Sequence, residues 1–302
     1  MHALARQQSR LKKRRERNHV TIRFATFNLL HGVPILGATA TSQQPVAAMP
    51  PGDDALLREA VCAINADIIG LQEVDVWQPR SAMAHQVESV AHALGAEHWL
   101  FAASVSGTPG EQGWTSGSDS HIHGSADDGH AIDQTPLYGV GLVSRLPVLS
   151  WQTERFDPAP LSLPLMVPSQ PRPRFIKVAD EPRSAIAAVI QGQHGVFTVA
   201  TAHLSFVPGY NVKQLRQLRT WLAGLPRPLI VMGDFNLPGN LPARITGYTS
   251  LVKQATYPSM RPTAQLDHIL ADGLMPSSIA SPAVVQPLSV SDHAAVSIDL
   301  DL

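Results

Sequence analysis

Cysteine is almost absent from this chain of 302 residues, which contains only Cys62. One cysteine cannot form an internal disulfide, so a disulfide-rich secreted scaffold is excluded, as is a zinc site built from several cysteines. Apolar runs long enough to cross a bilayer are also missing, which predicts that the chain has no transmembrane segment. These absences together predict a cytoplasmic protein.

Charge is sparse and unevenly distributed. Charged residues make up 16% of the chain, and the formal net charge is -1. The first 20 residues hold seven Lys and Arg and a single acid, so this segment is +6 and the rest of the chain is -7. No apolar stretch follows these charges, so they do not form a signal peptide. We therefore expect a basic, disordered tail over residues 1–20, either solvated or in contact with nucleic acid or acidic lipid, and one folded domain over residues 21–302.

Apolar, strand-like runs recur through this domain, with helical patterns between some of them. Val212, Leu215, Leu218 and Leu222 fall on one face of a helix, the stripe expected for packing against a sheet. Strands interleaved with helices predict an α/β or α+β fold with a buried sheet. We expect strands at residues 20–27, 68–72, 138–144, 184–191, 196–204, 228–233, 266–270 and 294–300, and helices at 53–65, 83–94 and 211–222.

Three stretches, at residues 36–52, 104–135 and 158–173, are rich in turn-forming or small residues and are expected to be loops. The second contains several His and Asp side chains, which are competent metal ligands. A mobile surface loop explains the same composition more simply. We therefore expect this loop to border a site without carrying its chemistry.

Polar residues replace the apolar pattern at the ends of the expected strands. Each one alone is explained by turn or helix capping. A buried sheet, however, would present its strand ends together at one rim. Carboxylate and amide oxygens form the hard site that suits Mg²⁺ or Mn²⁺, and His and Asp beside them can handle protons. Metal-assisted hydrolysis is therefore predicted for the set Asn28, Glu73, His203, Asp234, Asn236, Asp267, Asp292 and His293.

The motifs that contain these residues resemble those of the endonuclease/exonuclease/phosphatase superfamily, which includes deoxyribonucleases, apurinic-site exonucleases and neutral sphingomyelinases. The resemblance extends from about residue 21 to 302. It implies a four-layer α/β sandwich, in which two mixed β-sheets pack together and are flanked by helices. The motifs occur in the family's order: Phe27-Asn28, Leu71-Gln72-Glu73, Ala202-His203-Leu204, Gly233-Asp234-Phe235-Asn236, Leu266-Asp267-His268 and Ser291-Asp292-His293.

The resemblance implies a divalent metal as cofactor. Glu73 resembles the principal metal carboxylate of the family, with Asn28 close by and Asp292 as a further ligand, and these three residues would bind the metal. The metal would be Mg²⁺ or Mn²⁺, because oxygen ligands suit both ions equally.

The resemblance also implies roles for five catalytic residues. His293 resembles the histidine that acts as a base or polarises the phosphate, and Asp267 resembles the carboxylate that orients its imidazole. Asp234 would align or deprotonate the attacking water. Asn236 would hold the phosphate or that water, and His203 would hydrogen-bond the phosphate.

Leu30 departs from the pattern of the apurinic-site enzymes, which carry an Asp two residues after the first Asn. This departure weakens a DNA-repair assignment. Asp75 follows Glu73 at alternate spacing, so both would lie on one side of an extended segment. His268 would point away from Asp267 and is expected to be structural. Three arginines could meet phosphate, although exposed ion pairs are the simpler expectation for them: Arg80, Arg145 and Arg183.

The function expected from these residues is metal-dependent hydrolysis of phosphoric ester bonds, as a phosphodiesterase that assists in-line attack by water. The substrate would be a small diester, a phospholipid head group or nucleic acid, and no obligate protein partner is expected. A DNA or RNA nuclease is the alternative, which the basic tail favours and the acidic body disfavours. A catalytically inactive binding protein on the same fold is a third possibility.

Overall fold

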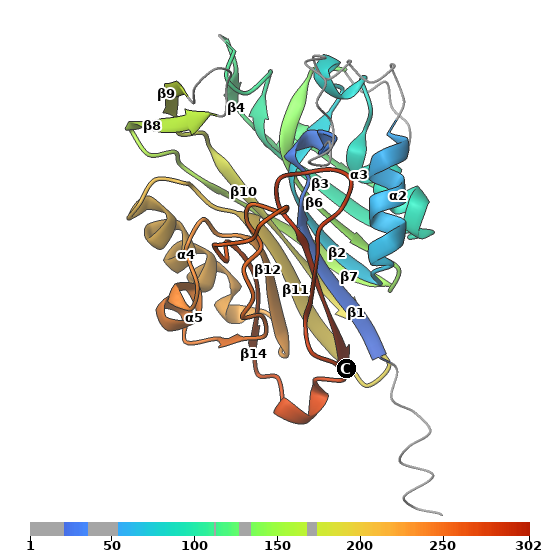
Figure 1. Ribbon diagram of the computed structural model, residues 1–302. Coiled ribbons are helices and arrows are strands. Elements are labelled where there is room, and N and C mark those ends of the chain that lie inside the picture. Colours follow the sequence, from blue (N-terminus) through green and yellow to red (C-terminus); the bar gives the residue numbers. More distant parts are fainter. Residues whose placement is uncertain (1–20, 36–53, 112, 127–133, 168–173) are drawn as a thin grey trace, which may run out of the picture.

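The structure is a computed structural model that describes residues 21–35, 54–111, 113–126, 134–167 and 174–302 (Figure 1). The expected basic tail over residues 1–20 and the expected loop over residues 36–52 lie outside these ranges. Within the ranges, no helix has both the length and the apolar character that crossing a membrane requires.

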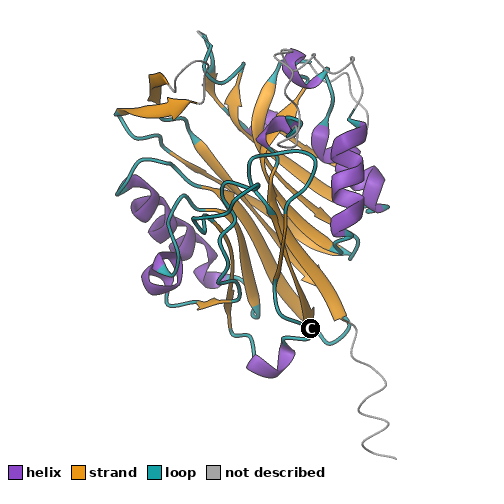
Figure 2. Cartoon of the chain, in the orientation of Figure 1, coloured by secondary structure: helices purple, strands orange, loops and turns teal. Residues whose placement is uncertain are grey.

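Two mixed sheets pack face to face, and a small hairpin of two strands stands apart from them (Figures 1 and 2). The first sheet has the order β15 (Val284–Gln286), β16 (Ala295–Asp301), β1 (Thr21–Asn28), β2 (Ile68–Val76), β6 (Leu137–Ser144), β3 (His98–Ser106) and β4 (Thr115–Ser116), and β5 (Ile122–Gly124) also pairs with β3. The second has the order β13 (Thr249–Ser250), β14 (Asp267–Asp272), β12 (Leu229–Asp234), β11 (Val196–His203), β10 (Arg183–Gln191) and β7 (Val148–Phe156). The separate hairpin is formed by β8 (Ser162–Val167) and β9 (Arg174–Ala179).

Helices cover the outer faces of both sheets (Figure 1). The helices α2 (Ala55–Ile64) and α3 (Gln86–Leu94) lie against the first sheet, where Leu57, Val61 and Val87 enter its outer core. The helices α4 (Tyr210–Trp221) and α5 (Leu241–Thr246) lie against the second sheet, where Leu215 and Leu218 are buried. A third apolar core fills the space between the sheets. Three cores between four layers confirm the expected sandwich.

The expected strands and helices are all present, but the assignment of loops was partly wrong. Residues 104–135 include the end of β3 together with β4 and β5, and residues 158–173 include β8. The long strands β3 and β7 were missed altogether. β7 lies at the edge of its sheet and several of its side chains are half-buried or exposed, so its sequence lacks the apolar run that marks a central strand.

The side chains that point into the space between the sheets change character along the strands. On β1 they are Ile22 and Phe24, and on β11 they are Phe197 and Val199, all buried in the inter-sheet core. Alternation continues each series toward one end of the sandwich, where it reaches Asn28, His203 and the other strand-end residues. Strand pairing aligns these ends, because the paired positions are Asn28↔Gln72, His203↔Asp234 and Asp234↔Asp267.

Candidate active site

Glu73 reaches this end of the sandwich because β2 contains a bulge. Three steps along β2, from Leu71 to Val74, match two steps along β6, from Gly141 to Gly139. Within the bulge Glu73 has φ of +55°, which a side chain larger than glycine seldom adopts. In a regular strand Glu73 would point away from the inter-sheet space that Gln72 faces. The bulge instead directs its carboxylate to the rim, where it is 19% exposed.

Asn28 connects Glu73 to the second sheet. Its amide Nδ2 donates to Oε1 of Glu73 at 2.9 Å and to Oδ2 of Asp234 at 3.1 Å. Its Oδ1 accepts from the backbone N–H of Leu30 at 3.0 Å, which fixes the orientation of the amide. Asn28 therefore presents its nitrogen, rather than its oxygen, to the two carboxylates.

Asp234 lies at the centre of the site, at the end of β12. Gly233 before it has φ of +144°, and a Cβ there would lie 2.0 Å from the carbonyl oxygen of Ala202, so only glycine fits. Oδ1 of Asp234 accepts from the backbone N–H of Asn236 at 2.9 Å. Burial, reinforced by the charge of Asp267, raises the pKa of Asp234 to about 7. Asp234 can therefore gain or lose a proton near neutral pH.

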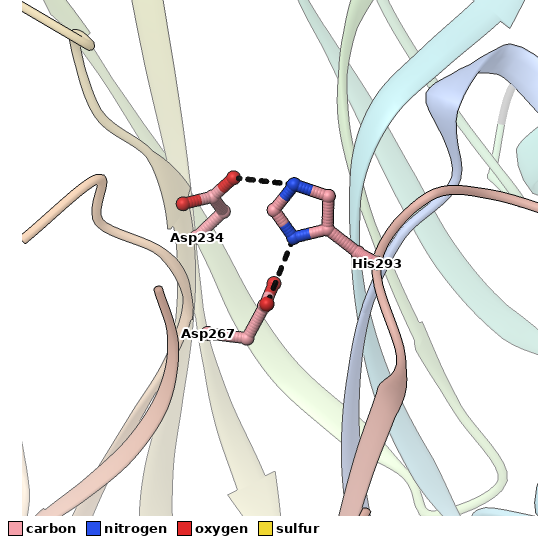
Figure 3. Close-up of side chains that lie close together, drawn as sticks. All are labelled: Asp234, Asp267 and His293. Atoms are coloured by element: carbon pink, nitrogen blue, oxygen red, sulfur yellow. Dashed lines mark hydrogen bonds and ion pairs between the residues drawn. The ribbon is translucent and has the colours of Figure 1, made fainter. Parts of the chain in front are cut away.

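His293 and Asp267 form a hydrogen-bonded pair beside Asp234 (Figure 3). Nδ1 of His293 donates to Oδ2 of Asp267 at 2.8 Å, and Nε2 lies 3.7 Å from Oδ2 of Asp234. Thr256 donates its hydroxyl to the same oxygen of Asp267 at 2.5 Å. Burial alone would lower the pKa of His293, but the charges of Asp267 and Asp234 outweigh it and raise that pKa to about 10. The imidazole is therefore a cation at neutral pH.

Ser291 holds the turn that carries His293. Its φ is +73°. Its Oγ donates to the backbone oxygen of Asn28 at 2.7 Å and accepts from the backbone N–H of His293 at 3.0 Å. The serine thus links the turn to the end of β1.

His203 faces both carboxylates from β11. Its Nε2 lies 3.8 Å from Oδ2 of Asp234 and 4.0 Å from Oε1 of Glu73. One guanidinium nitrogen of Arg183, Nη1, lies 3.1 Å from Nδ1 and 3.4 Å from Nε2 of this imidazole. An atom this close to both ring nitrogens would clash with the carbon between them if it lay in the ring plane, so this nitrogen lies over the ring face. Burial first, and then Arg183, lowers the pKa of His203 well below its ordinary value, so the ring is neutral.

Asn236 and Asp292 complete the predicted set. Asn236 donates its amide to the backbone oxygen of Leu204 at 3.0 Å, and its Nδ2 lies 3.4 Å from Nε2 of His203. Asp292 is half-buried next to His293. Burial raises its pKa, and the charge of Glu73 raises it further. Direct contacts therefore link seven of the predicted residues, and Asp292 is coupled to them through its charge.

The donor chemistry of this end fits a divalent cation. The pKa values of Asp234 and Asp292 are raised because both carboxylates are withdrawn from water and lie near other carboxylates. A bound cation would offset this unfavourable concentration of negative charge. Oxygen ligands predominate, as Mg²⁺ and Mn²⁺ require. One oxygen each from Asp234 and Asp267 and one nitrogen from His293 also lie within 4.8 Å of one another.

The other candidates lie in structural roles. Asp75 forms a bidentate ion pair with Arg80 at 2.8 Å. Burial raises the pKa of Asp75, and the charge of Glu73 raises it further. Arg145 donates to the backbone oxygen of Leu94 at 2.7 Å. His268 is fully buried and its Nε2 donates to the backbone oxygen of Leu237 at 2.8 Å, as a structural role requires.

For Arg183 the expectation of an exposed ion pair was wrong. This residue is 5% exposed and its Nη1 contacts His203 at 3.1 Å, with Asp180 at 3.6 Å as its ionic partner. Sequence reasoning also missed Gln72, Thr256 and Ser291 as residues that hold the site. Thr256 and Ser291 lie in or beside recognisable motifs, but the contacts that give them a role join distant parts of the chain.

Comparisons with known proteins identify the family and the fold of the chain. The model of the endonuclease/exonuclease/phosphatase family matches residues 25–293. No curated protein sequence matches the chain. A solved endonuclease/exonuclease/phosphatase from Beutenbergia cavernae DSM 12333 is 18% identical, with a TM-score of 0.57 over 94% of this chain and 72% of that one.

Two further solved structures share the fold. A family protein from Leptotrichia buccalis C-1013-b is 12% identical, with a TM-score of 0.56 over 93% of this chain and 100% of that one. The human Nocturnin catalytic domain, solved with a bound sulfate anion, is 18% identical, with a TM-score of 0.50 over 92% of each chain. The family match over most of the chain shows that this protein belongs to the endonuclease/exonuclease/phosphatase family, whose members hydrolyse phosphoric ester bonds.

Proposed function

We propose that this protein is a metal-dependent phosphodiesterase. The observation that carries the proposal is the arrangement of Asp267, His293 and Asp234 beside Glu73. A cationic imidazole, a carboxylate that titrates near neutral pH and a half-buried carboxylate meet at one end of the sandwich. In-line attack by water on a phosphodiester uses groups of these three kinds.

We assign the cation, Mg²⁺ or Mn²⁺, to Glu73 and Asp292, with Asn28 orienting Glu73. When bound, the cation would polarise a phosphoryl oxygen and neutralise charge on the departing oxygen. The cluster of Asp234, Asp267 and His293 is the less suitable place for it. Nδ1 of His293 is already committed to Asp267, and a protonated imidazole has no lone pair to offer a metal.

Asp234 is the proposed acceptor of the proton from the attacking water. A pKa of about 7 leaves much of the carboxylate ionised at neutral pH, while keeping it basic enough to take a proton. The hydrogen bond from the backbone of Asn236 occupies Oδ1, so Oδ2 is the atom that faces Asn28, His203 and His293. Oδ2 is therefore the atom that we assign to proton transfer.

His293, Asn236 and His203 are proposed to hold the phosphate. The cationic ring of His293 donates from Nε2 to a phosphoryl oxygen, while Asp267 fixes the ring from the other side. The neutral ring of His203 and the amide of Asn236 add hydrogen bonds from β11 and the end of β12. The three groups come from different segments, so their positions depend on the packing of the two sheets.

Net charge supports a small diester or a phospholipid head group as substrate. A body of -7 lacks the overall basic character of proteins that grip long nucleic acid. The +6 segment over residues 1–20 favours the alternative, a nuclease, because it could bring phosphate backbones to the protein.

Hydrolysis of bis(p-nitrophenyl) phosphate, sphingomyelin vesicles and plasmid DNA, measured side by side with Mg²⁺, Mn²⁺ or EDTA, tests the proposal. We expect metal-dependent turnover of the diester or the lipid, lost in Glu73→Gln. Glu97→Gln is the matched control, because Glu97 is exposed just before His98, at the opposite end of β3 from the site. Equal activity of wild type and Glu73→Gln would remove Glu73 from the site. Metal-dependent cleavage of plasmid alone would favour the nuclease.

A further inference from the structure

A layer of uncharged polar side chains lies between the apolar inter-sheet core and the site. It consists of Thr26, Gln72 and Thr201, each 0% exposed. Thr26 donates its hydroxyl to Oε1 of Gln72 at 3.1 Å, and Nε2 of Gln72 donates to Oγ1 of Thr201 at 2.9 Å. Gln72 thereby connects two strands of the first sheet to β11 of the second.

Each member of this layer is followed by a residue of the site. Asn28 comes two residues after Thr26 and His203 two residues after Thr201, so in each pair the side chains lie on the same face of a strand. Glu73 comes directly after Gln72, within the bulge. The amide of Gln72 thus links the two sheets directly beside the site. The next residue, Glu73, faces His203 at 4.0 Å.

The bulge makes Glu73 dependent on its neighbour. A glutamate with φ of +55° is strained, and such a conformation persists only where surrounding contacts enforce it. Asn28 contacts the carboxylate itself at 2.9 Å, and Gln72 is bonded on both sides at the preceding residue. A one-residue slip of β2 would break both bonds of Gln72 and turn Glu73 out of the site.

We propose that Gln72 is a positioning residue for Glu73, holding the bulge of β2 in the register that presents the carboxylate to the cation and to His203. Gln72 does not touch the substrate or the reacting atoms; it acts through Glu73. The inference rests on the proposed function, since it takes Glu73 to be the principal metal carboxylate.

Direct binding of Mn²⁺, measured by calorimetry on the full chain, tests this role without reference to a substrate. Gln72→Met keeps the length of the side chain and removes both hydrogen bonds. We expect a loss of about 10- to 100-fold in Mn²⁺ affinity, the range seen when groups that orient metal ligands are removed. Thr201→Val should share the loss, whereas Thr201→Ser, which keeps the hydroxyl, should bind Mn²⁺ as the wild type does.

Ser104→Ala is the matched control. Ser104 on β3 donates to Ser184 on β10 at 2.8 Å, so it also makes a buried hydrogen bond between the two sheets, but from a strand that β6 separates from β2. Thermal unfolding should show lower melting temperatures for both Gln72→Met and Ser104→Ala. Only Gln72→Met and Thr201→Val should lose Mn²⁺ affinity.

Two outcomes would overturn the inference, and they differ in what else they overturn. If Glu73→Gln abolishes Mn²⁺ binding but Gln72→Met and Thr201→Val bind as the wild type does, Gln72 is a structural residue and the proposed metal site stands. If Glu73→Gln binds Mn²⁺ as the wild type does, the proposed metal site fails, and the role of Gln72 fails with it.

Discussion

At the scale of single residues, burial and neighbouring charge give chemically similar side chains different protonation states. His203 and His293 both face Asp234, at 3.8 and 3.7 Å. Burial, and then the charge of Arg183, keeps His203 neutral, whereas the charges of Asp267 and Asp234 outweigh burial and keep His293 cationic. One histidine can therefore donate or accept a hydrogen bond, and the other carries a positive charge to the phosphate.

Asp267→Asn should change the protonation state of His293. Removing the charge that raises the pKa of His293 should bring that pKa down from about 10 toward its ordinary value, which NMR titration of the ring would measure. We expect kcat for diester hydrolysis to fall by ~10²-fold or more. Asp272→Asn, at the other end of β14 and paired with Arg227 at 2.8 Å, is the control and should stay near wild type. Full activity in Asp267→Asn would exclude its proposed role.

The sequence predicts which residues form the site better than it predicts how they are held. Asn28, His203 and Asp234 follow regular strands, so their convergence at one rim follows from alternation and topology. Glu73 depends on a bulge, whose extra residue becomes visible only once β2 is paired with β6. The burial of Arg183 was unpredictable for a similar reason, because its partner His203 lies 20 positions away on the neighbouring strand.

At the scale of elements, the ends of the central strands place the chemistry. Strands buried on both faces were predictable from their apolar runs, whereas β7 at a sheet edge was not. The end of β12 shows how demanding this placement is. Gly233 has a positive φ, and its backbone approaches the carbonyl oxygen of Ala202 too closely for a side chain.

Gly233→Ala should therefore be much more destabilising than a glycine substitution with the same backbone strain. Gly195, in the turn before β11, has φ of +139° and would have open space around a Cβ. We expect Gly195→Ala to cost roughly 1–3 kcal/mol of unfolding free energy, from backbone strain alone. The clash with the backbone of Ala202 should cost Gly233→Ala about 1–3 kcal/mol more. Urea unfolding measures both, and equal losses would contradict the close contact seen here.

At the scale of the whole molecule, neutral histidines that are half-buried or buried predict sensitivity to acid. Burial lowers the pKa of His31, His85 and His268 to about 4 each. Below pH 6.5, the ordinary histidine pKa, these side chains bind protons in the unfolded chain but stay neutral in the folded protein. The stability that these residues provide is therefore complete above pH 6.5 and is lost as pH falls toward 4.

His268→Gln isolates one of these contributions. The wild-type ring donates to Leu237 and accepts from Gln265 at 3.2 Å, and protonation would abolish the acceptor. Gln does not titrate, so acid should destabilise the wild type more than the variant. Relative to the variant, the wild type should lose on the order of 3 kcal/mol of unfolding free energy between pH 7.5 and 4. Urea unfolding across this range, without added metal, measures the gap. Parallel curves would show that His268 is not a source of the acid sensitivity.

Charge distribution over the whole chain leads to a test of substrate class. Deleting residues 1–20 changes the net charge from -1 to -7. The shortened chain begins at Thr21, at the opposite end of β1 from Asn28. The eight residues of β1, at roughly 3.3 Å each, separate these two ends by more than 20 Å. Hydrolysis of bis(p-nitrophenyl) phosphate should therefore be unchanged within about twofold, a margin small against the effect of removing a proton-transfer group.

Plasmid DNA is the discriminating ligand for the same deletion. If residues 1–20 contact phosphate backbones, the full chain should bind DNA with an affinity that falls steeply with salt, and the deletion should flatten that dependence. Equal salt dependence in the two forms would leave the -7 body as the only DNA-binding surface, which is unfavourable for a nuclease. Loss of small-diester hydrolysis in the deletion would instead make the basic segment part of the site, and would contradict the assignment of catalysis to residues 21–302.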